Sequence, residues 1–244
     1  MMSYKNIPRL YINKELKSNK EIELIAKDTH YLKNVLRFKE NKKIKVFNGI
    51  DGEWEAIVIS KDINNIRCLK KIKKQFSEDG PSLYFAIIKS NNLRWLLEKS
   101  TELGVKNLYP MVTDRVNIKS FNFEKAKLHL KEASEVSERL EIPNLHELNT
   151  LKDTLLKFND KSGNIIFCNE ARDDIHLSNY LKKNFSKNIS FMIGPEGGFS
   201  DNEIKSIYAN PYINRVKIHD RILRSETAAV LVMSIYKNYL QLLE

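Results

Sequence analysis

The sequence predicts an α/β protein in which a small N-terminal β-barrel precedes a mainly parallel α/β sheet. In residues 1–75, short segments rich in β-branched residues alternate with turns, which is typical of a small barrel. Beyond residue 81, apolar strands alternate with helices, which favours a parallel sheet covered by helices. A polar stretch that ends in Gly80-Pro81 separates the two patterns. We therefore expect a barrel domain over residues 1–75 and an α/β domain over residues 76–244.

Four strands and one helix are expected in the barrel domain. The strands carry recurring β-branched residues and cover residues 9–12, 44–48, 53–59 and 66–72. Glycine-containing turns at 48–49 and 51–52 lie between two of these strands. Residues 29–36 are expected to form a helix, with Asp28 or Thr29 as its N-cap.

The α/β domain is expected to alternate strands and helices along its whole length. The apolar strand segments are residues 83–88, 108–112, 164–168, 189–193 and 215–218. The segments with helical periodicity are residues 92–103, 123–140, 177–183, 201–209 and 226–243. The last of these helices is apolar on most sides, so it needs cover on more than one side, which favours a subunit interface.

The net charge of +10 is concentrated in the barrel domain. Residues 1–75 contain 18 Lys or Arg against 9 Asp or Glu, whereas the rest of the chain contains 23 against 22. Concentrated positive charge attracts a polyanion through phosphate neutralisation and counterion release. An AT-rich genome would raise the lysine content along the whole chain, which is not the pattern here. The charge distribution therefore favours a nucleic-acid partner.

Composition excludes several other classes of protein. A hydrophobic content of 42% with 30% charged residues is globular and gives no sign of disorder. The longest apolar run, residues 228–233, is far too short to span a bilayer, and no secretion signal is recognisable at the N-terminus. Cys68 and Cys168 alone indicate neither a disulfide framework nor a zinc site. We therefore expect a cytoplasmic protein with no membrane contact and no metal.

The stretch 193–200 (IGPEGGFS) leaves a predicted strand and enters a predicted helix. Its three glycines permit positive φ angles and a close approach of backbone amides to a ligand. Ser200 and Glu203 form the S-x-x-E pattern of a capping box, which is a structural role. No Lys-Ser or Lys-Thr follows the glycines, so a phosphate-binding P-loop is not indicated. Ligand binding and a tight turn without a ligand both remain open.

The stretch 221–229 (RILRSETAA) leads into the final predicted helix. A helix N-terminus offers free backbone N–H groups, and here two arginines and a carboxylate flank it. Ser225 could be an ordinary N-cap. The two arginines need an anion or solvent, because they lie beside a mostly apolar helix.

Together these stretches resemble the RsmE family of 16S ribosomal RNA uridine N3-methyltransferases, within the SPOUT superfamily of trefoil-knotted enzymes. IGPEGGFSDNE and RILRSETAA look like the two signature segments of the family, and residues 93–116 resemble its characteristic helix-strand segment. The similarity continues in shorter matches at residues 8–11, 30–37, 133–135, 139 and 142–143. It covers nearly the whole chain in the right order. Two positions depart from the family's usual pattern: Val136 replaces Gln, and His219 replaces Gly.

The resemblance implies a PUA-like barrel followed by a SPOUT-type trefoil-knotted α/β domain that acts as a homodimer. Knots are rare in proteins, so only the resemblance predicts this one. It also implies that loops of the knot hold S-adenosylmethionine, with Glu196 as the carboxylate expected near the sulfonium charge. The residues that would form the cofactor site are Asn169, Glu170, Gly194, Pro195, Glu196, Gly197, Gly198, Ile218, Leu223, Arg224, Ser225, Glu226, Thr227 and Ala228.

The implied reaction is methyl transfer from S-adenosylmethionine to uridine N3, an in-line displacement that needs no metal and no covalent intermediate. Because N3 carries a proton, it must be deprotonated before or during attack. A cation near the uracil oxygens would stabilise the resulting anion, and we expect Arg224 in this role. Glu226 could act as the base, although compensation of the helix N-terminal charge is an equally suitable role.

The implied partner is 16S rRNA in the small ribosomal subunit, with the target base unstacked and presented. Basic residues of the barrel and its surroundings are expected to position this RNA through phosphates. The candidates for RNA binding are Arg9, Arg37, Lys70, Lys71, Lys73, Lys74 and Arg139. Trp54 and Trp95 could stack on bases, but packing is the more common role at strand and helix positions.

Two other functions are compatible with the same sequence features. A knotted enzyme that methylates the ribose 2′-hydroxyl would share the cofactor site but would activate an alcohol. A ribosome assembly factor could retain the fold and bind RNA without catalysis. Analysis of the methylated nucleoside separates the first alternative, and S-adenosylmethionine binding separates the second.

Overall fold

The computed structural model describes residues 7–116, 121–170 and 173–242. The chain forms two compact units. The first unit contains Met1–Ser77 together with Ser134–Ile142, and the second contains Glu78–Ala133 and Pro143–Glu244. The first unit thus includes a short segment that lies far from the barrel in sequence.

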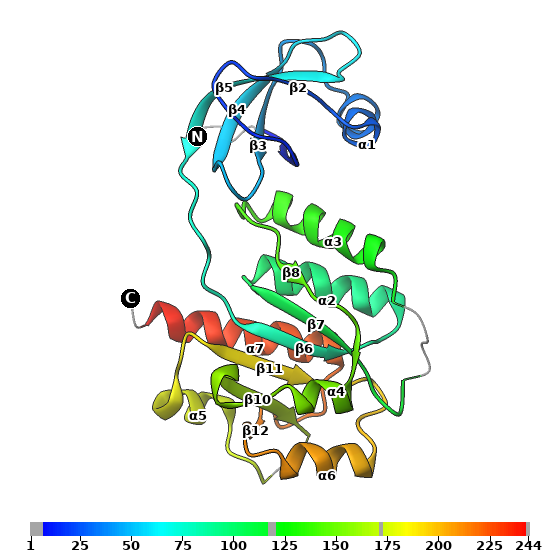
Figure 1. Cartoon of the computed structure of the whole chain (residues 1–244), viewed down its shortest axis with the longest axis vertical. Coiled ribbons are helices and arrows are strands. Elements are labelled where there is room, and N and C mark those ends of the chain that lie inside the picture. Colours follow the sequence, from blue (N-terminus) through cyan, green and yellow to red (C-terminus); the bar gives the residue numbers. More distant parts are fainter. Residues whose placement is uncertain (1–6, 117–120, 171–172, 243–244) are drawn as a thin grey trace. The chain divides into compact units, whose positions relative to one another are not determined.

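The first unit is built around a curled five-stranded sheet with the strand order β1-β3-β4-β5-β2 (Figure 1). Its strands are β1 (Arg9–Tyr11), β2 (Glu21–Glu23), β3 (Lys43–Phe47), β4 (Glu53–Val58) and β5 (Asn65–Lys73). β1 runs parallel to β3, and the other pairs are antiparallel. The four predicted barrel strands are confirmed within one or two residues, whereas β2 was not predicted.

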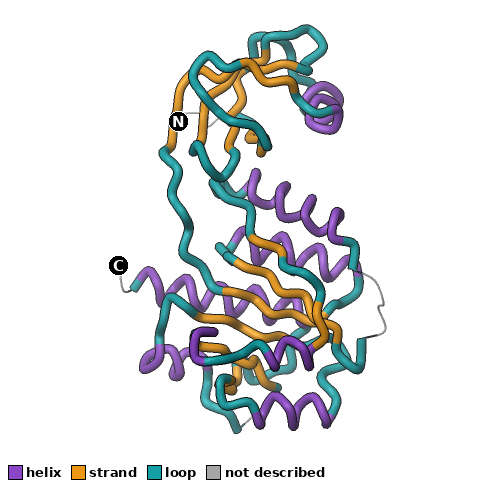
Figure 2. The backbone as a smooth tube through the Cα atoms, in the orientation of Figure 1, coloured by secondary structure: helices purple, strands orange, loops and turns teal. Residues whose placement is uncertain are grey.

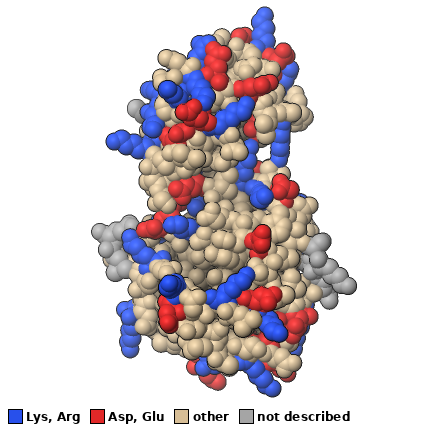
Figure 3. All heavy atoms as spheres, in the orientation of Figure 1, with Lys and Arg blue, Asp and Glu red and all other residues tan. Residues whose placement is uncertain are grey.

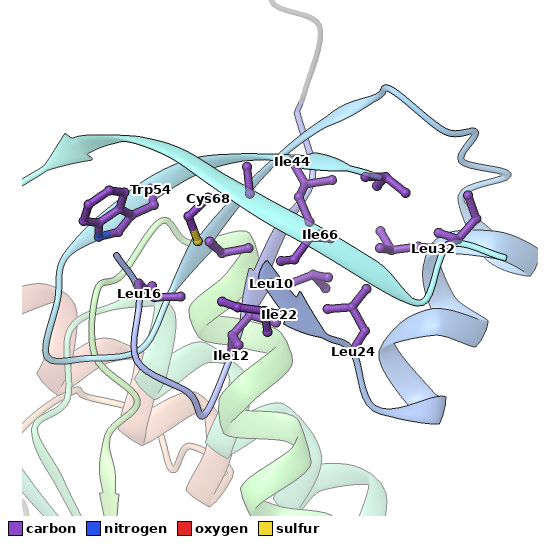
Figure 4. Packing of buried hydrophobic residues seen from close by; sticks show 14 residues of the cluster. Leu10, Ile12, Leu16, Ile22, Leu24, Leu32, Ile44, Trp54, Ile66 and Cys68 are labelled. Atoms are coloured by element: carbon purple, nitrogen blue, oxygen red, sulfur yellow. The ribbon is translucent and has the colours of Figure 1, made fainter. Parts of the chain in front are cut away.

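The core of this unit is a cluster of aliphatic side chains enclosed by the curled sheet (Figure 4). Ile44 and Ile66 point into it from neighbouring parts of the sheet, and Leu32 enters it from the helical segment; all three are fully buried. Successive side chains of a strand point to opposite faces of the sheet, so Trp54, Ala56 and Val58 of β4 all lie on the inner, buried face. Trp54 is therefore a packing residue, and its indole nitrogen donates to the Asp51 carbonyl.

The helical segment of the first unit begins earlier than predicted. It consists of α1 (Ala26–His30), which continues directly into a π-helical turn over Tyr31–Val35. Ile25 occupies the N-cap position without a side-chain hydrogen bond. The prediction of Asp28 or Thr29 as the cap is wrong, because Asp28 lies inside the first turn and is buried.

The second unit contains a seven-stranded sheet in which every pair is parallel. The order is β12-β10-β11-β6-β7-β8, and β9 also pairs with β7. The strands are β6 (Ser82–Ala86), β7 (Asn107–Val112), β8 (Asn144–Leu145), β9 (Asn149–Thr150), β10 (Asn164–Asn169), β11 (Ile189–Ile193) and β12 (Ile213–Lys217). The predicted parallel α/β sheet is confirmed, and only the two-residue strands β8 and β9 were missed.

Helices cover both faces of this sheet (Figures 1 and 2). Neighbouring residues of β11 show the two faces: Phe191 contacts Tyr236 of α7, whereas Met192 packs in a cluster with Leu155 of α4 and Ile207 of α6. α7 (Ser225–Gln241) packs with α2 (Ser90–Glu102) on the first face. On the other face, α4 (Leu151–Leu156) packs with α6 (Asp201–Ala209). α5 (Leu177–Asn184) lies beside β12.

Helix α3 (Phe123–Val136) ends four residues before the predicted end of its segment at residue 140. Glu138 adopts a positive φ of 61°, which a continuing helix cannot accommodate. Val136, one of the departures from the family pattern, lies at this end and is 80% exposed. Its replacement of a polar residue therefore disturbs no buried contact.

Candidate functional site

Three parallel strands, β10, β11 and β12, end at the same edge of the sheet in the second unit. In open α/β sheets, ligands bind beyond the carboxyl ends of the strands. The loops that leave these three strands line a cavity of about 500 Å³, together with the start of α7. The glycine-rich stretch after β11 and the arginine-containing stretch before α7 therefore meet in one cavity.

A hydrogen bond joins these two stretches directly. The Ser225 hydroxyl at the start of α7 donates to the Gly194 carbonyl at 2.6 Å. Ser225 is buried, so this bond is shielded from water. A Cβ atom at Gly194 would lie 2.6 Å from the ring of Phe199, so only glycine fits at this position. Gly198 has a φ of 67° and closes the turn by donating to the Pro195 carbonyl.

The far end of the glycine-rich loop is held by the predicted capping box, which is confirmed. The Ser200 hydroxyl accepts from the Glu203 backbone N–H, and the Glu203 carboxylate accepts from the Ser200 backbone N–H. Glu203 also accepts from the Asp114 backbone N–H, which ties the loop after β7 to the same helix start. Next to it, the Arg115 guanidinium donates to the Gly197 carbonyl at 3.1 Å. Four hydrogen bonds therefore fix this wall of the cavity.

The cavity combines acidic side chains with open backbone donors. Glu170 and Glu196 line it, and they lie in different loops. Within the described residues, the backbone N–H groups of Glu196, Gly197 and Leu223 donate to no protein acceptor. Carboxylates favour a cationic ligand, and free N–H groups suit ring nitrogens or a carboxylate of the same ligand. The residues present therefore fit a ligand that carries both a positive centre and hydrogen-bond acceptors.

Most of the predicted cofactor residues line this cavity, and three do not. Those that line it are Asn169, Glu170, Gly194, Pro195, Glu196, Gly197, Gly198, Ile218, Leu223, Ser225 and Ala228. Arg224 is the N-cap residue of α7 and is exposed. Its backbone carbonyl accepts from the Ala228 N–H, whereas its guanidinium has no hydrogen bond or ion pair to any described residue. Glu226 is buried, and its Oε2 has no hydrogen-bond partner among the described residues. Thr227 is exposed on the first turn of α7.

The sequence analysis did not predict three other residues as part of the cavity lining, although it named His219 as a departure from the family pattern. Arg115, Cys168 and His219 lie at or just beyond the carboxyl ends of β7, β10 and β12, respectively. Their position at strand ends is the signal that could have identified them. The His219 Nδ1 accepts from the Arg221 backbone N–H at 2.9 Å, so a side chain closes a local turn where the family usually has Gly. Burial raises the pKa of the Cys168 thiol, which keeps it neutral at physiological pH.

The expectation that Arg9 contacts RNA is not met in this structure, because its guanidinium is used inside the first unit. Arg9 is 7% exposed and forms an ion pair with Glu53. Its remaining N–H groups donate to the carbonyls of Ser134, Glu135 and Arg139. Arg9 therefore fastens the segment 134–142 to the barrel. Arg139 is also buried, with 4% exposure, so its side chain does not lie on the surface.

The other basic candidates of the barrel are exposed. These are Arg37, Lys70, Lys71, Lys73 and Lys74. The Lys73 ammonium forms an ion pair with Glu138, and the Lys71 ammonium lies 5.4 Å above the Trp54 ring. On the face drawn in Figure 3, the basic side chains of this unit are interspersed with acidic ones. On this face the basic side chains therefore do not form an unbroken basic surface.

Comparison with known proteins identifies the family of both units. Residues 80–237 match the family of RNA methyltransferase domains, and residues 24–69 match the PUA domain of RNA methyltransferases. The ribosomal RNA small subunit methyltransferase E of Rickettsia conorii is 33% identical over 226 residues, which is 91% of each chain. The enzyme of the same name from Buchnera aphidicola subsp. Schizaphis graminum is 31% identical and covers 93% of this chain and 94% of its own. The chain belongs to the family of ribosomal RNA small subunit methyltransferase E.

Solved structures of similar proteins confirm the fold class. A ribosomal RNA small subunit methyltransferase E from Neisseria gonorrhoeae, bound to S-adenosyl methionine, superposes with a TM-score of 0.83 at 23% identity, covering 96% of this chain and 98% of that one. A methyltransferase from Legionella pneumophila with bound cofactor SAM gives a TM-score of 0.82 with the same coverage. The fold is thus a SPOUT-type α/β domain with a PUA-like N-terminal domain.

No three or more His, Cys, Asp or Glu side chains in residues 7–116, 121–170 and 173–242 are grouped so that they could hold a metal ion. Over the same residues, no helix has the length and apolar character that crossing a membrane requires.

Proposed function

We propose that this protein transfers a methyl group from S-adenosylmethionine to N3 of a uridine in 16S rRNA, the uridine numbered 1498 in the standard numbering. The observation that carries the proposal is the cavity in which residues 194–198 and the start of α7 meet, joined by the Ser225–Gly194 hydrogen bond. The relatives that share the family name act on ribosomal RNA of the small subunit, and the Neisseria protein was solved with S-adenosyl methionine.

S-adenosylmethionine fits the chemistry of the cavity. When bound, it supplies a methyl group on a sulfonium carrying a positive charge. Glu196 and Glu170 would face this charge, and the open N–H groups of Gly197 and Leu223 would donate to the adenine nitrogens or to the amino acid carboxylate. The lack of a side chain at Gly194 leaves room for the Phe199 ring, which lines the cavity. The predicted cofactor residues that line the cavity are proposed to make these contacts.

In the reaction, a bond forms between uridine N3 and the methyl carbon while the bond from that carbon to sulfur breaks. S-adenosylhomocysteine leaves as a neutral thioether, and the N3 proton must pass to a base. Arg224 is proposed to stabilise negative charge on the uracil oxygens, because its exposed guanidinium has no partner among the described residues. Glu226 is the candidate base, since its buried Oε2 has no hydrogen-bond partner among the described residues.

Of the two predicted domains, the one at residues 1–75 would bind RNA and the one at residues 76–244 would bind the cofactor and catalyse methyl transfer. The exposed Arg37, Lys70 and Lys71 are proposed to contact RNA phosphates. A cytoplasmic location follows from an rRNA substrate. We also propose a homodimer, because two large apolar side chains, Trp95 of α2 and Leu242 just after α7, are 48% and 81% exposed.

The proposal is tested by mapping methyl incorporation into small ribosomal subunits that lack the modification. Digestion to nucleosides should yield 3-methyluridine, whereas a labelled 2′-O-methyl nucleoside would assign the protein to the ribose-modifying alternative. Calorimetry with S-adenosylmethionine tests the assembly-factor alternative, which predicts no binding by the folded protein.

Arg224→Ala tests the proposed role of the guanidinium. We expect kcat to fall by about 100-fold or more while the RNA affinity changes little, because the interaction is made mainly in the transition state. Arg224→Lys is the matched control, since it keeps a positive charge and should retain part of the rate. Equal losses of kcat and RNA affinity in Arg224→Ala would contradict this role.

A further inference from the structure

The second unit contains another cavity, of about 660 Å³, which is separate from the cofactor cavity. It lies between the segment that follows β6, the first half of α2 and the first half of α3. Its volume is within the range of roughly 300–1,000 Å³ that is common for small-molecule sites. Apolar side chains form much of its lining, namely Ile87, Ile88, Leu93, Leu97 and Ala126.

Two lysines on the rim of this cavity have ammonium groups without a partner. Lys89 follows β6, and Lys125 lies in the first turn of α3. Neither forms an ion pair or a side-chain hydrogen bond with any described residue. Arg94, the third basic residue of the lining, forms an ion pair with Glu98. The rim therefore has free positive charge, which repels a cation such as S-adenosylmethionine and attracts phosphates.

His129 points to a ligand that hydrogen-bonds inside this cavity. Its side chain lines the cavity and is only 8% exposed, yet its Nδ1 has no hydrogen-bond partner among the described residues. The nearest carboxylate oxygen, Glu98 Oε1, lies 3.9 Å away. Burial, with the positive charge of Arg94, lowers the pKa of His129, so the ring is neutral at physiological pH. A buried polar atom left unpaired costs free energy, which a polar ligand would offset.

The two cavities adjoin at Glu196. Glu196 lines the cofactor cavity, and its Oε1 lies 3.4 Å from the Lys89 backbone nitrogen and 3.5 Å from the Asn92 amide nitrogen. Lys89 and Asn92 both line the second cavity. Methyl transfer requires the acceptor atom to reach the donor methyl group in line. A base in the second cavity would be a direct neighbour of a donor in the first.

We propose that the second cavity is the acceptor-nucleotide site, which receives the unstacked uridine of a single-stranded RNA segment. The uracil would lie on the apolar side chains of Leu93 and Ala126, with one carbonyl oxygen toward Nδ1 of His129. Its N3 atom and its other carbonyl oxygen would face out of this cavity toward the methyl donor and the residues proposed to act on them. Lys89 and Lys125 would hold the adjoining phosphates. This assignment rests on the proposed function and goes beyond it, because it places the substrate in a cavity that the cofactor residues do not line.

The test uses the full-length protein, S-adenosylmethionine and an RNA hairpin that carries the target uridine. Lys125→Ala and His129→Phe should each raise the KM for RNA by about tenfold, the loss expected for one hydrogen bond or phosphate contact to a nucleotide. Their dissociation constants for S-adenosylmethionine should stay at the wild-type value. Lys127→Ala is the matched control: it removes an exposed lysine that lies on the same helix and pairs with Glu124, and it should leave the KM unchanged.

A second measurement does not depend on the stability of any variant. With 4-thiouridine at the target position, irradiation should crosslink the RNA to peptides that contain residues 87–97 or 122–129. Crosslinks confined to other peptides, or wild-type KM values in both variants, would overturn the acceptor site while wild-type methyl transfer still supports the proposed function. If a variant changes the molar mass of the protein particle in light scattering but leaves the KM for RNA unchanged, the cavity binds a second copy of the chain and not RNA. Absence of methyl transfer by the wild-type protein to small ribosomal subunits that lack the modification would instead refute the proposed function itself.

Discussion

Arg9 and Glu53 form an ion pair inside the first unit, with side chains that are 4% and 0% exposed. The Arg9 guanidinium also donates to three backbone carbonyls in the segment 134–142 and lies 4.4 Å from the centre of the Phe47 ring. One side chain thus joins β1, β3, β4 and a segment that is more than a hundred residues away in sequence. We therefore expect this ion pair to contribute strongly to the folding stability of the first unit.

Arg9→Ala should destabilise the first unit by about 3–5 kcal/mol, because it leaves the buried Glu53 carboxylate without its main counter-charge. Thermal or denaturant unfolding of the full chain measures the loss. Arg67→Ala is the matched control, since Arg67 pairs with Glu21 on the surface of the same sheet, where such pairs contribute about 0–1 kcal/mol. If Arg9→Ala keeps wild-type stability and loses only RNA affinity, the buried role is wrong.

Asp51 stabilises the turn between β3 and β4 through its carboxylate. Its Oδ2 accepts from the Leu16 backbone N–H at 2.8 Å and from the Asn48 side-chain amide at 2.7 Å. These hydrogen bonds hold the pKa of Asp51 below its ordinary value of 3.8. Asp51→Ala should cost about 1–2 kcal/mol, a value reduced for partial exposure to solvent.

The Asp51 contribution has a defined pH dependence. Because the folded-state pKa is lowered, the stabilisation is complete above pH 3.8 and is lost as the pH falls through the lower folded-state value. Unfolding curves of the wild type and of Asp51→Ala should therefore converge in strong acid. Asp62→Ala removes an exposed carboxylate of the same unit that pairs with Lys33, and this control should match the wild type at every pH. A stability gap that persists below the folded-state pKa would contradict the argument.

The sequence predicted the parts of the fold that depend on local pattern. The apolar runs of β10 and β11 and the periodicity of α6 are strong signals over five to nine residues, and each is confirmed. β2 was missed because it has three residues, of which only Ile22 is buried, and it exists through pairing with β5 more than forty residues away. α4, with six residues, was missed for the same reason of length.

For the site, too, the sequence predicted features that depend on local motifs and missed those that depend on contacts between distant residues. The resemblance to the RsmE family implied the meeting of residues 194–198 with the start of α7, whereas the residues alone left open whether the glycine-rich stretch binds a ligand. No local pattern could show that Arg9 would be buried, because its partner Glu53 is 44 residues away and the other acceptors are backbone carbonyls. The unpaired nitrogen of His129 was equally hidden, since helical spacing shows a buried face but not an absent partner.

Gly194→Ala should impair the cofactor cavity. Its Cβ would lie 2.6 Å from the Phe199 ring, which is buried and cannot move without disturbing the core. Overpacking of this kind costs about 1–3 kcal/mol of folding stability. Because the displaced Phe199 ring lines the cavity, the dissociation constant for S-adenosylmethionine should also rise, by about tenfold. Gly197→Ala is the matched control, because its Cβ would meet Arg115 at an ordinary 3.6 Å. Equal binding by the two variants in calorimetry would show that the close approach of Gly194 to Phe199 has no effect on the ligand.

The two cysteines offer a test of cavity occupancy in the unmodified protein. Cys168 lines the cofactor cavity and is partly exposed, whereas Cys68 is fully buried in the first unit. Burial raises the pKa of both thiols, so at pH 7.5 both are protonated and should react slowly with iodoacetamide. Cys168 should still react faster, because reagent can enter its cavity. S-adenosylmethionine should slow the alkylation of Cys168 and leave the alkylation rate of Cys68 unchanged, and peptide mass spectrometry measures both rates. Equal protection of both thiols would indicate that the whole fold becomes more rigid and not that a ligand occupies this cavity.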